Sequence, residues 1–359
     1  MDNVKAKITV LLTGCGAPGA PGIIACLRRA EEREIRIVGV DMNGNAGARS
    51  LVDAFHAVPA AGDAAYIDAV LDICAAEKTD VVLPIVTREL AKYADAAARF
   101  EERGIKVSVM NSETLEIVNN KARLLEKLRG LGLPTPWFRA VNSVSELEQA
   151  CREAGFPRRA VCVKGAVGNG SRGVRLLDAG KSRFELFFDS KPNSMYISYD
   201  ELIRTLSEKP DMPEMLVMEL LPGTEYSVDI LADRGKTLYS VSRRALSVVT
   251  SNMMSLTIDD NQQVLDLCRT VAEKLKMDGN FGFDLLYNKN ETQPYIIECN
   301  PRLTAGVVSC AAAGVNLPYL GIKRLLGEPL PDCTVKCGTR MSRHYVEDFF
   351  DAEGKQISW

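Results

Sequence analysis

Four polar residues late in the chain have the types and the spacing of a site for metal-bound phosphates. Asp284 lies within one short apolar run, and Glu298, Asn300 and Arg302 come with the next one. Hard oxygen ligands of this kind suit magnesium, an ion that proteins often share with nucleotide phosphates. An arginine just past such ligands suits an anionic substrate or a phosphoryl group in transfer.

Two paired strands are needed to bring these side chains together. Residues 281–287 and 294–299 are rich in aromatic and branched side chains, and the Asn-Lys-Asn between them favours a turn. Folding this hairpin puts Asp284 opposite, or nearly opposite, Glu298. Like charges in that position are destabilising, and a divalent cation between them would remove the penalty.

Alternation of side chains along the second strand gives a more detailed expectation. Ile296, Glu298 and Asn300 share one face, while Ile297 lies on the reverse face. The carboxylates and the amide then form one polar patch on an apolar sheet. An ordinary hairpin with an exposed polar face would show the same pattern, so the rest of the chain must decide between the two interpretations.

A lysine followed by glycines lies near the middle of the chain. Lys164 ends a buried run at residues 160–163, and four glycines within residues 165–173 precede a second run at 174–177. Glycines let backbone N–H groups approach phosphate oxygens, and the lysine adds a point charge. The segment is not a Walker loop, because the lysine precedes the glycines and a strand follows. It predicts a phosphate-covering hairpin, with a plain glycine-rich hairpin as the alternative.

Taken in order, these motifs resemble the ATP-grasp ligases, and among them the branch of the carbamoyl phosphate synthase large subunit. Asp284 followed by Glu298-x-Asn300-x-Arg302 looks like the metal-site signature of that superfamily. The resemblance covers roughly residues 112–330. Lys121, the lysine of the glycine hairpin and the segment from Glu219 to Glu225 fall in the family order.

The resemblance implies a role for each candidate residue. Lysines would reach the nucleotide phosphates, a strand-to-strand link would hold adenine, and Glu225 would hold the ribose hydroxyls. The implied nucleotide-binding residues are Lys121, Lys164, Gly168, Asn169, Gly170, Ser171, Met218, Glu219, Leu220, Leu221 and Glu225. The implied metal ligands are Asp284, Glu298 and Asn300. The implied catalytic residues are Arg302 and Arg243.

The resemblance also implies the fold and the reaction. The fold is α/β, with an α+β catalytic part: a Rossmann-like domain at 1–112, a small lobe with the glycine hairpin at 113–218, and a C-terminal lobe with the metal site at 219–359. The reaction is an ATP-dependent ligation, in which a small-molecule carboxylate becomes an acyl phosphate and is joined to an amine. ATP is the co-substrate, Mg²⁺ or Mn²⁺ is the metal, and a homodimer is common in the family.

The first forty residues carry a second glycine pattern. Residues 14–19 match Gly-x-Gly-x-x-Gly after an apolar run, and Asp41 follows about twenty residues later, as in dinucleotide-binding turns. Pro18 and Pro21 remove backbone donors that a pyrophosphate would use. Two interpretations of this segment stay open: an NAD(P)-binding Rossmann enzyme, or a Rossmann-like domain that frames a substrate cleft. A non-catalytic ATP-binding module is the third alternative.

Two short polar segments are weaker candidates. Residues 87–89, Thr-Arg-Glu, follow the carboxyl end of a predicted strand, where open α/β sheets bind ligands. Arg243 and Arg244 leave a strand predicted at 237–241, and paired arginines suit a carboxylate or an acyl phosphate. Surface charge would give the same pattern in both places.

Two longer segments have no assigned role. Residues 180–215 depart from a minimal ATP-grasp pattern and carry several aromatic side chains, either as part of the fold or as a loop over the cleft. The tail from residue 333 onward is predicted to be strand-rich and to contain no site.

Composition limits the classes of partner and the compartment. The chain has 359 residues, 46% hydrophobic and 25% charged, with a net charge of −3. This length suits two or three domains, and the charge gives no reason to expect nucleic acid or a membrane as partner. Ten scattered cysteines in mostly apolar surroundings predict free buried thiols in a reducing cytoplasm. Two histidines disfavour a zinc site.

Overall fold

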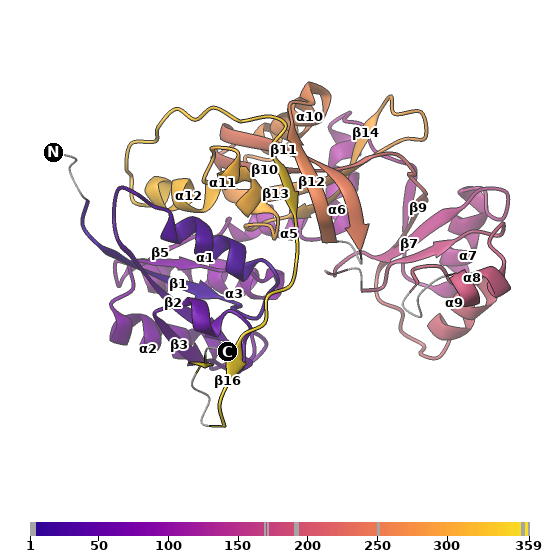
Figure 1. The fold of residues 1–359 in the computed structure, drawn as a ribbon. Helices are drawn as coiled ribbons and strands as arrows, with labels where there is room; N and C mark the ends of the chain where they lie inside the picture. Colours follow the sequence, from indigo (N-terminus) through magenta and orange to yellow (C-terminus); the bar gives the residue numbers. More distant parts are fainter. Residues whose placement is uncertain are drawn as a thin grey trace.

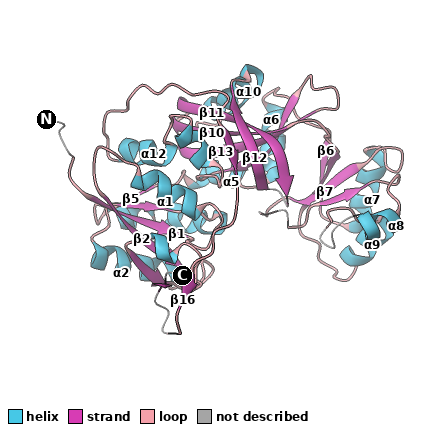
Figure 2. Ribbon diagram, viewed as in Figure 1, coloured by secondary structure: helices cyan, strands magenta, loops and turns pink. Residues whose placement is uncertain are grey.

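The computed structural model describes residues 5–168, 170, 172–189, 194–249, 252–352 and 356–357. Within these ranges the protein has three parts in a row, each built on its own sheet (Figures 1 and 2). The N-terminal domain and the small lobe lie at the two ends, and a six-stranded antiparallel sheet lies between them.

The N-terminal domain is a parallel sheet in the order β3-β2-β1-β4-β5. Its central strands are buried on both faces, which explains why their sequences read as continuous apolar runs. The strands are β1 (Ile8–Thr13), β2 (Ile35–Asp41), β3 (Ala54–Ala57), β4 (Val81–Leu83) and β5 (Lys106–Val107). The helical segments are α1 (Ala20–Arg28), η1 (Arg49–Leu51), α2 (Tyr66–Glu77), η2 (Thr87–Glu89), α3 (Leu90–Asp95) and α4 (Ala97–Glu101).

The small lobe is an antiparallel sheet in the order β6-β9-β7-β8, with helices packed against it. Ser143 caps the first of these helices by accepting a hydrogen bond from the Glu146 amide at 3.2 Å. The strands are β6 (Phe138–Val141), β7 (Val161–Gly165), β8 (Arg175–Leu177) and β9 (Met215–Glu219). The helices are α7 (Val144–Glu153), α8 (Arg183–Asp189) and α9 (Tyr199–Leu206).

The central sheet has the order β14-β13-β10-β11-β12-β15. Its strands are β10 (Glu225–Asp233), β11 (Lys236–Val249), β12 (Asn252–Asp259), β13 (Gly279–Tyr287), β14 (Pro294–Asn300) and β15 (Arg340–Ser342). The helices that pack around it are α5 (Ser112–Val118), α6 (Lys121–Gly130), α10 (Gln262–Lys274), α11 (Val307–Ala312) and α12 (Leu317–Leu325).

Side-chain alternation divides the central sheet into two faces. Val228 and Ile230 of β10 share a core with α6 and α10, together with Phe283 of β13. Leu231 lies in the other core, which also contains α11, α12 and the sheet of the N-terminal domain. Polar residues of β10 and β13 at the alternate positions therefore face the side where the N-terminal domain docks.

The N-terminal domain contacts the central part through its glycine turn and α1. A Cβ atom placed on Gly19 would lie 2.9 Å from the Cα of Ala305, and one on Gly22 would lie 3.2 Å from Val308. Such close approach of two backbones requires glycine. The glycine turn is thus packed against the loop that precedes α11.

The chain after α12 forms what we call the C-terminal strap, residues 328–352. It adds β15 to the edge of the central sheet and then runs along the N-terminal domain to the small β16 (Phe349–Phe350) and β17 (Gln356–Ile357) pair (Figure 1). Asp348 accepts a hydrogen bond from Ser50 at 2.7 Å. The strap therefore contacts both the central sheet and the N-terminal domain.

Candidate active site

A cavity of about 960 Å³ lies where the three parts meet. It is lined by the N-terminal glycine turn, the glycine hairpin between β7 and β8, the link from β9 to β10, and the exposed ends of β10, β13 and β14. The predicted site residues that line it are Lys121, Lys164, Gly168, Gly170, Met218, Glu219, Leu220, Leu221, Glu225, Arg243, Asp284, Glu298, Asn300 and Arg302. Asn169 and Ser171 lie outside the described residues.

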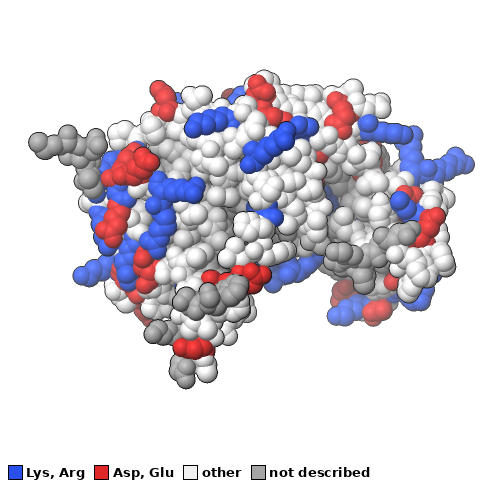
Figure 3. All heavy atoms as spheres, viewed as in Figure 1, with Lys and Arg blue, Asp and Glu red and all other residues white. Residues whose placement is uncertain are grey.

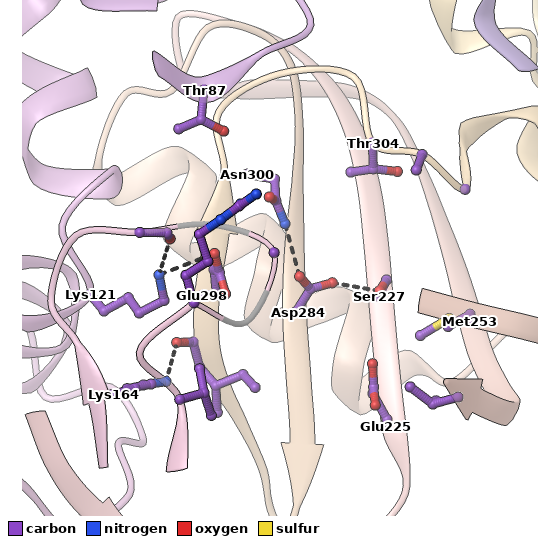
Figure 4. Close-up of a pocket in the computed structure, with 18 of the residues that line it drawn as sticks. Thr87, Lys121, Lys164, Glu225, Ser227, Met253, Asp284, Glu298, Asn300 and Thr304 are labelled. Atoms are coloured by element: carbon purple, nitrogen blue, oxygen red, sulfur yellow. Dashed lines mark hydrogen bonds and ion pairs between the residues drawn. The ribbon is translucent and has the colours of Figure 1, made fainter. Parts of the chain in front are cut away.

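The two predicted metal-binding carboxylates face each other across the hairpin. Asp284 and Glu298 are direct partners in the β13–β14 pairing, as the sequence predicted. Asp284 accepts hydrogen bonds from Ser227 Oγ at 2.6 Å and from Asn300 Nδ2 at 2.8 Å (Figure 4). Burial raises the pKa of Asp284, and the nearby Glu298 carboxylate raises that pKa further.

A β-bulge next to Asp284 changes the faces of β14. Asp284 pairs with Glu298 but Leu285 pairs with Ile296, so Ile297 is the inserted residue. Ile296 is fully buried in the core, and Ile297 lines the cavity. The prediction that Ile296 shares a face with Glu298 is wrong, because one extra residue reverses the alternation.

Two lysines reach the hairpin from the small lobe and from α6 (Figure 4). Lys164 is buried, and its Nζ donates to the carbonyl of Ile297, the bulged residue, at 3.0 Å. Burial lowers the pKa of Lys164. Lys121, the first residue of α6, donates to the carbonyl of Gly168 at 2.7 Å and lies 3.2 Å from Glu298 Oε1. Lys121 therefore joins the glycine hairpin to the carboxylate pair.

The donor set fits a hard divalent cation. Among the described residues, no group of three or more His, Cys, Asp and Glu side chains could hold a metal by itself. The predicted ligand set instead combines two carboxylates with an amide. Asp284, Glu298 and Asn300 supply these oxygens on adjacent strands. Magnesium commonly takes one or two carboxylates and completes its shell with water and substrate phosphates. Repulsion between the Asp284 and Glu298 carboxylates adds to the effect of burial on the pKa of Asp284, and a cation between them would remove that repulsion.

Alternation along β10 places two further polar residues beside Asp284. Glu225 and Ser227 both line the cavity, and Figure 4 shows their side chains on the same side as Asp284. Burial raises the pKa of Glu225 to about 7, and the Asp284 carboxylate contributes. The sequence analysis missed Ser227. Counting two residues on from Glu225 along a strand would have found it.

The position of Arg243 differs from the prediction. Strand β11 continues to Val249, so Arg243 and Arg244 lie within it on opposite faces rather than leaving it together. Arg243 is buried, and its Nε donates to Asp229 at 2.6 Å while Nη2 donates to Thr304 Oγ1 at 3.0 Å. Arg244 faces away and lies 3.5 Å from Asp259.

Arg302 connects the hairpin to the N-terminal domain. Its Nε donates to Thr87 Oγ1 at 3.1 Å, and its Nη1 donates to the carbonyl of Leu303 at 2.9 Å. Burial lowers the pKa of Arg302. Thr87, which the sequence offered as a weak candidate, thus lies in the cavity wall beside a predicted catalytic residue.

The N-terminal glycine turn is occupied by internal contacts. The Gly16 amide donates to Asp41 Oδ2 at 2.7 Å, so the acid that would bind a ribose in a dinucleotide site is bonded to its own turn. Gly19 packs against Ala305. Pro18 and Gly19 line the cavity, which fits a turn that frames a cleft.

Two cavity residues come from segments to which the sequence gave no role. Arg343 of the C-terminal strap lines the cavity, although the sequence indicated no site in the tail. The reason is the pairing of β15 with β12, a contact between distant segments that no local pattern encodes. Met195 brings the region between β8 and β9 to the cavity wall as well.

Two family descriptions match the chain. Residues 10–108 match "PylC-like, N-terminal domain", and residues 211–347 match "ATP-grasp in the biosynthetic pathway with Ter operon". The second match contains the carboxylate hairpin. The chain thus carries an ATP-grasp domain behind a PylC-like N-terminal domain.

Solved structures support the same fold. The chain aligns with an ADP complex of N5-carboxyaminoimidazole ribonucleotide synthetase at a TM-score of 0.68 and 18% identity, covering 93% of this chain and 81% of that one. An L-amino acid ligase from Bacillus licheniformis aligns at a TM-score of 0.62 and 17% identity, covering 90% and 74%. The predicted N-terminal domain followed by an ATP-grasp fold is confirmed.

Curated relatives are distant in sequence. The carbamoyl phosphate synthase large chain of Pyrococcus furiosus is 22% identical over 304 residues, which are 82% of this chain and 26% of the relative. The formate-dependent phosphoribosylglycinamide formyltransferase of a Nitratiruptor species is 24% identical over 330 residues, 89% of this chain and 76% of the relative. The chain thus spans about a quarter of the Pyrococcus furiosus synthase chain and of that from Clostridium acetobutylicum.

The surface and the helices add two observations. On the face in Figure 3, lysines and arginines are interspersed with aspartates and glutamates, and no large patch has a single sign. In the part of the chain that the structure describes, each helix is too short or too polar to cross a bilayer.

Proposed function

We propose that this protein is an ATP-dependent carboxylate–amine ligase that uses Mg²⁺ or Mn²⁺. The observation that carries the proposal is one cluster: Asp284 and Glu298 face each other beneath a glycine hairpin that Lys121 ties to Glu298. Carboxylates, an amide and lysines in this arrangement are suited to a triphosphate and its metal. Relatives and neighbours named as ligases and synthases support it.

The nucleotide would lie between the small lobe and β10. The backbone of residues 218–221 can offer N–H and C=O groups to adenine, while the Glu219 side chain is engaged with the Trp137 amide at 2.8 Å. Glu225, when ionised, is a good acceptor for the two ribose hydroxyls. Lys164, Lys121 and the amides of the glycine hairpin face the phosphates.

The chain's own residues then prepare the reaction. A bound metal would neutralise charge on the phosphates. Asp284, Glu298 and Asn300 would hold it, and Ser227 orients Asp284 through the 2.6 Å hydrogen bond. Arg302 lies at the edge of this cluster, where it can stabilise the negative charge of a carboxylate or of a phosphoryl group. Arg243 is bonded to Asp229 and Thr304, and so positions the loop next to Arg302.

The proposed reaction has two steps. An oxygen of the substrate carboxylate attacks the γ-phosphorus of ATP, the bond to the β-phosphate oxygen breaks, and ADP leaves. An amine then attacks the acyl carbon, the C–O bond to phosphate breaks, and the amine loses a proton. Water must be kept away from the acyl phosphate, a task suited to the glycine hairpin that covers the cavity.

The alternatives are less well supported. The N-terminal turn has its Gly16 amide bonded to Asp41 Oδ2, so this amide is not free to bind a pyrophosphate. A non-catalytic ATP-binding module would not need a complete set of carboxylates, amide and arginine.

Three further parts of the proposal follow. The protein acts in the cytoplasm, since all ten cysteines are free thiols and seven are buried. It forms a homodimer, and its substrates are a small carboxylic acid and an amine. The division into parts at 112/113 and 218/219 also stays a prediction.

The test is phosphate release from magnesium-ATP with a panel of carboxylic acids and amines. We expect one acid to stimulate release, and Asp284→Asn to lower the stimulated rate by roughly 10²–10³-fold. Asp266→Asn, an exposed aspartate on α10, is the matched control and should keep the wild-type rate. An Asp284→Asn protein that releases phosphate as fast as the control would disprove the metal assignment.

A further inference from the structure

Three arginines surround one loop at the end of the cavity beyond Asn300. The loop is residues 303–306, between β14 and α11. Arg302 donates to the carbonyl of Leu303, Arg243 donates to the hydroxyl of Thr304, and Arg343 Nη2 donates to the carbonyl of Ala305 at 2.5 Å. The three guanidinium groups come from the end of β14, from β11 and from the C-terminal strap, and all three residues line the cavity.

Only one of these charges is balanced by an acid within the described residues. Arg243 forms an ion pair with Asp229 at 2.6 Å. Arg302 and Arg343 contact carbonyl, hydroxyl and amide oxygens, and no carboxylate of the described part lies within ion-pair distance of either. Burial lowers the pKa of Arg343, and the nearby Arg243 lowers it further. Arg302 still lies in the electrostatic field of Asp284 and Glu298, whereas only Arg243 acts on Arg343 in this way. A partly buried cation without counter-charge favours a bound anion.

Arg343 is held in a fixed position. Its Nε donates to the carbonyl of Met253 at 3.2 Å, and its Nη2 donates to Ala305. These two bonds fix the guanidinium plane and leave Nη1 without a hydrogen bond among the described residues. A fixed planar donor suits recognition of a carboxylate or a phosphate.

We propose that Arg343 binds a second anionic group of the acid substrate, whose reacting carboxylate lies at Arg302. This inference rests on the proposed ligase function and narrows it to acids that carry a second carboxylate or a phosphate. Arg302 and Arg343 contact Leu303 and Ala305, two residues apart on one loop, so a short acid can reach both. The glycine turn of the N-terminal domain, with Gly19 against Ala305, closes this end of the cavity.

The experiment measures binding of matched acids to the full chain, with and without magnesium-ADP. Each pair differs in one anionic group: glutarate against butyrate, L-glutamate against L-glutamine, and 3-phosphoglycerate against glycerate. We expect the wild-type protein to bind at least one dianion about tenfold more tightly than its partner, as one charge-assisted bond would give. Arg343→Gln should bring that ratio close to one.

Two variants control for structural damage. Arg343→Lys keeps the charge and should keep most of the preference. Arg340→Gln removes an exposed charge three residues earlier in the same strap, outside the cavity lining, and should leave the preference unchanged.

Each outcome has a defined meaning. If the dianion binds more tightly in the glutarate or the glutamate pair, the second anionic group is a carboxylate. If only 3-phosphoglycerate binds more tightly than its partner, the second anionic group is a phosphate. No preference in any wild-type pair, or a preference that survives in Arg343→Gln, overturns the inference. If the preference holds but no acid stimulates phosphate release, the anion site stands and the ligase proposal fails. If an acid stimulates phosphate release but the wild-type protein shows no preference, the ligase proposal stands and the anion-site inference fails.

Discussion

The two ends of the cavity are built in different ways. The end that carries the proposed metal ligands, which we call the metal end, has Asp284, Glu298 and Asn300 on two consecutive strands joined by a short turn. The arginine end uses Arg243, Arg302 and Arg343 from three separate elements, all packed around residues 303–306. One end is defined by a hairpin, and the other by the docking of distant parts of the chain.

The difference explains why one end could be predicted. The contact between Arg302 and Thr87 joins residues 215 positions apart, and the bond from Arg343 to Ala305 depends on β15 reaching the far edge of the sheet. Strand alternation gives no information about such contacts. Substitutions in the buried Arg243–Asp229 pair at the arginine end should therefore act mainly on stability, and substitutions of Asp284 or Glu298 at the metal end should act mainly on the proposed reaction.

The largest effect on stability is expected from Asp229→Asn. Asp229 is the buried partner of Arg243, and its removal leaves a buried guanidinium without its counter-charge. We expect the free energy of unfolding to fall by about 3–5 kcal/mol, measured by urea denaturation. Asp68→Asn removes an exposed ion pair with Arg99 and should change stability by less than about 1 kcal/mol. Equal effects of the two substitutions would contradict the buried role of Asp229.

A smaller effect is expected from Gly19→Ala. The added Cβ would lie 2.9 Å from Ala305 Cα, a backbone atom that cannot move alone. Gly19 has an ordinary φ of −85°, so the effect comes from the contact rather than from backbone strain. We expect a loss of about 1–3 kcal/mol in unfolding free energy. Gly44→Ala, where no atom lies within 4 Å of the new Cβ, should be close to neutral.

If Gly19→Ala is as stable as Gly44→Ala, the glycine turn is not packed against the 303–306 loop as described. The arginine end would then be less dependent on docking of the N-terminal domain than we conclude.

The smallest effect concerns Glu225 at the metal end. Its pKa is raised to about 7 by burial, so the native state holds the proton more tightly than the unfolded chain. The contribution of Glu225 to stability is therefore fully present below its ordinary pKa of about 4.3 and decreases as the pH rises toward 7. Glu225→Gln removes this decrease. Urea denaturation at about pH 5 and about pH 8 should show the variant gaining stability over wild type at the higher pH. A difference that does not change with pH would mean that Glu225 is not buried in the native state.

Several features could be predicted because they depend on neighbouring strands. Opposed carboxylates, the lysine ahead of the glycine hairpin, and the Ser143 cap all follow from residue types at short spacing. One prediction within the same hairpin was wrong, the placing of Ile296 on the same face as Glu298. The bulge at Ile297 that causes this has no marker in the sequence, and it gives Lys164 a carbonyl to bind.

The sequence by itself determined the metal end and the order of the nucleotide-binding segments, because hydrogen bonding between adjacent strands and side-chain alternation act over short stretches of chain. Tertiary structure alone decided that Arg343 lines the cavity, that Arg243 is paired with Asp229, and that the N-terminal glycines pack against Ala305. These contacts form when separate apolar surfaces are buried against each other. Burial of apolar surface is non-directional, so the residues that it brings together carry no local pattern.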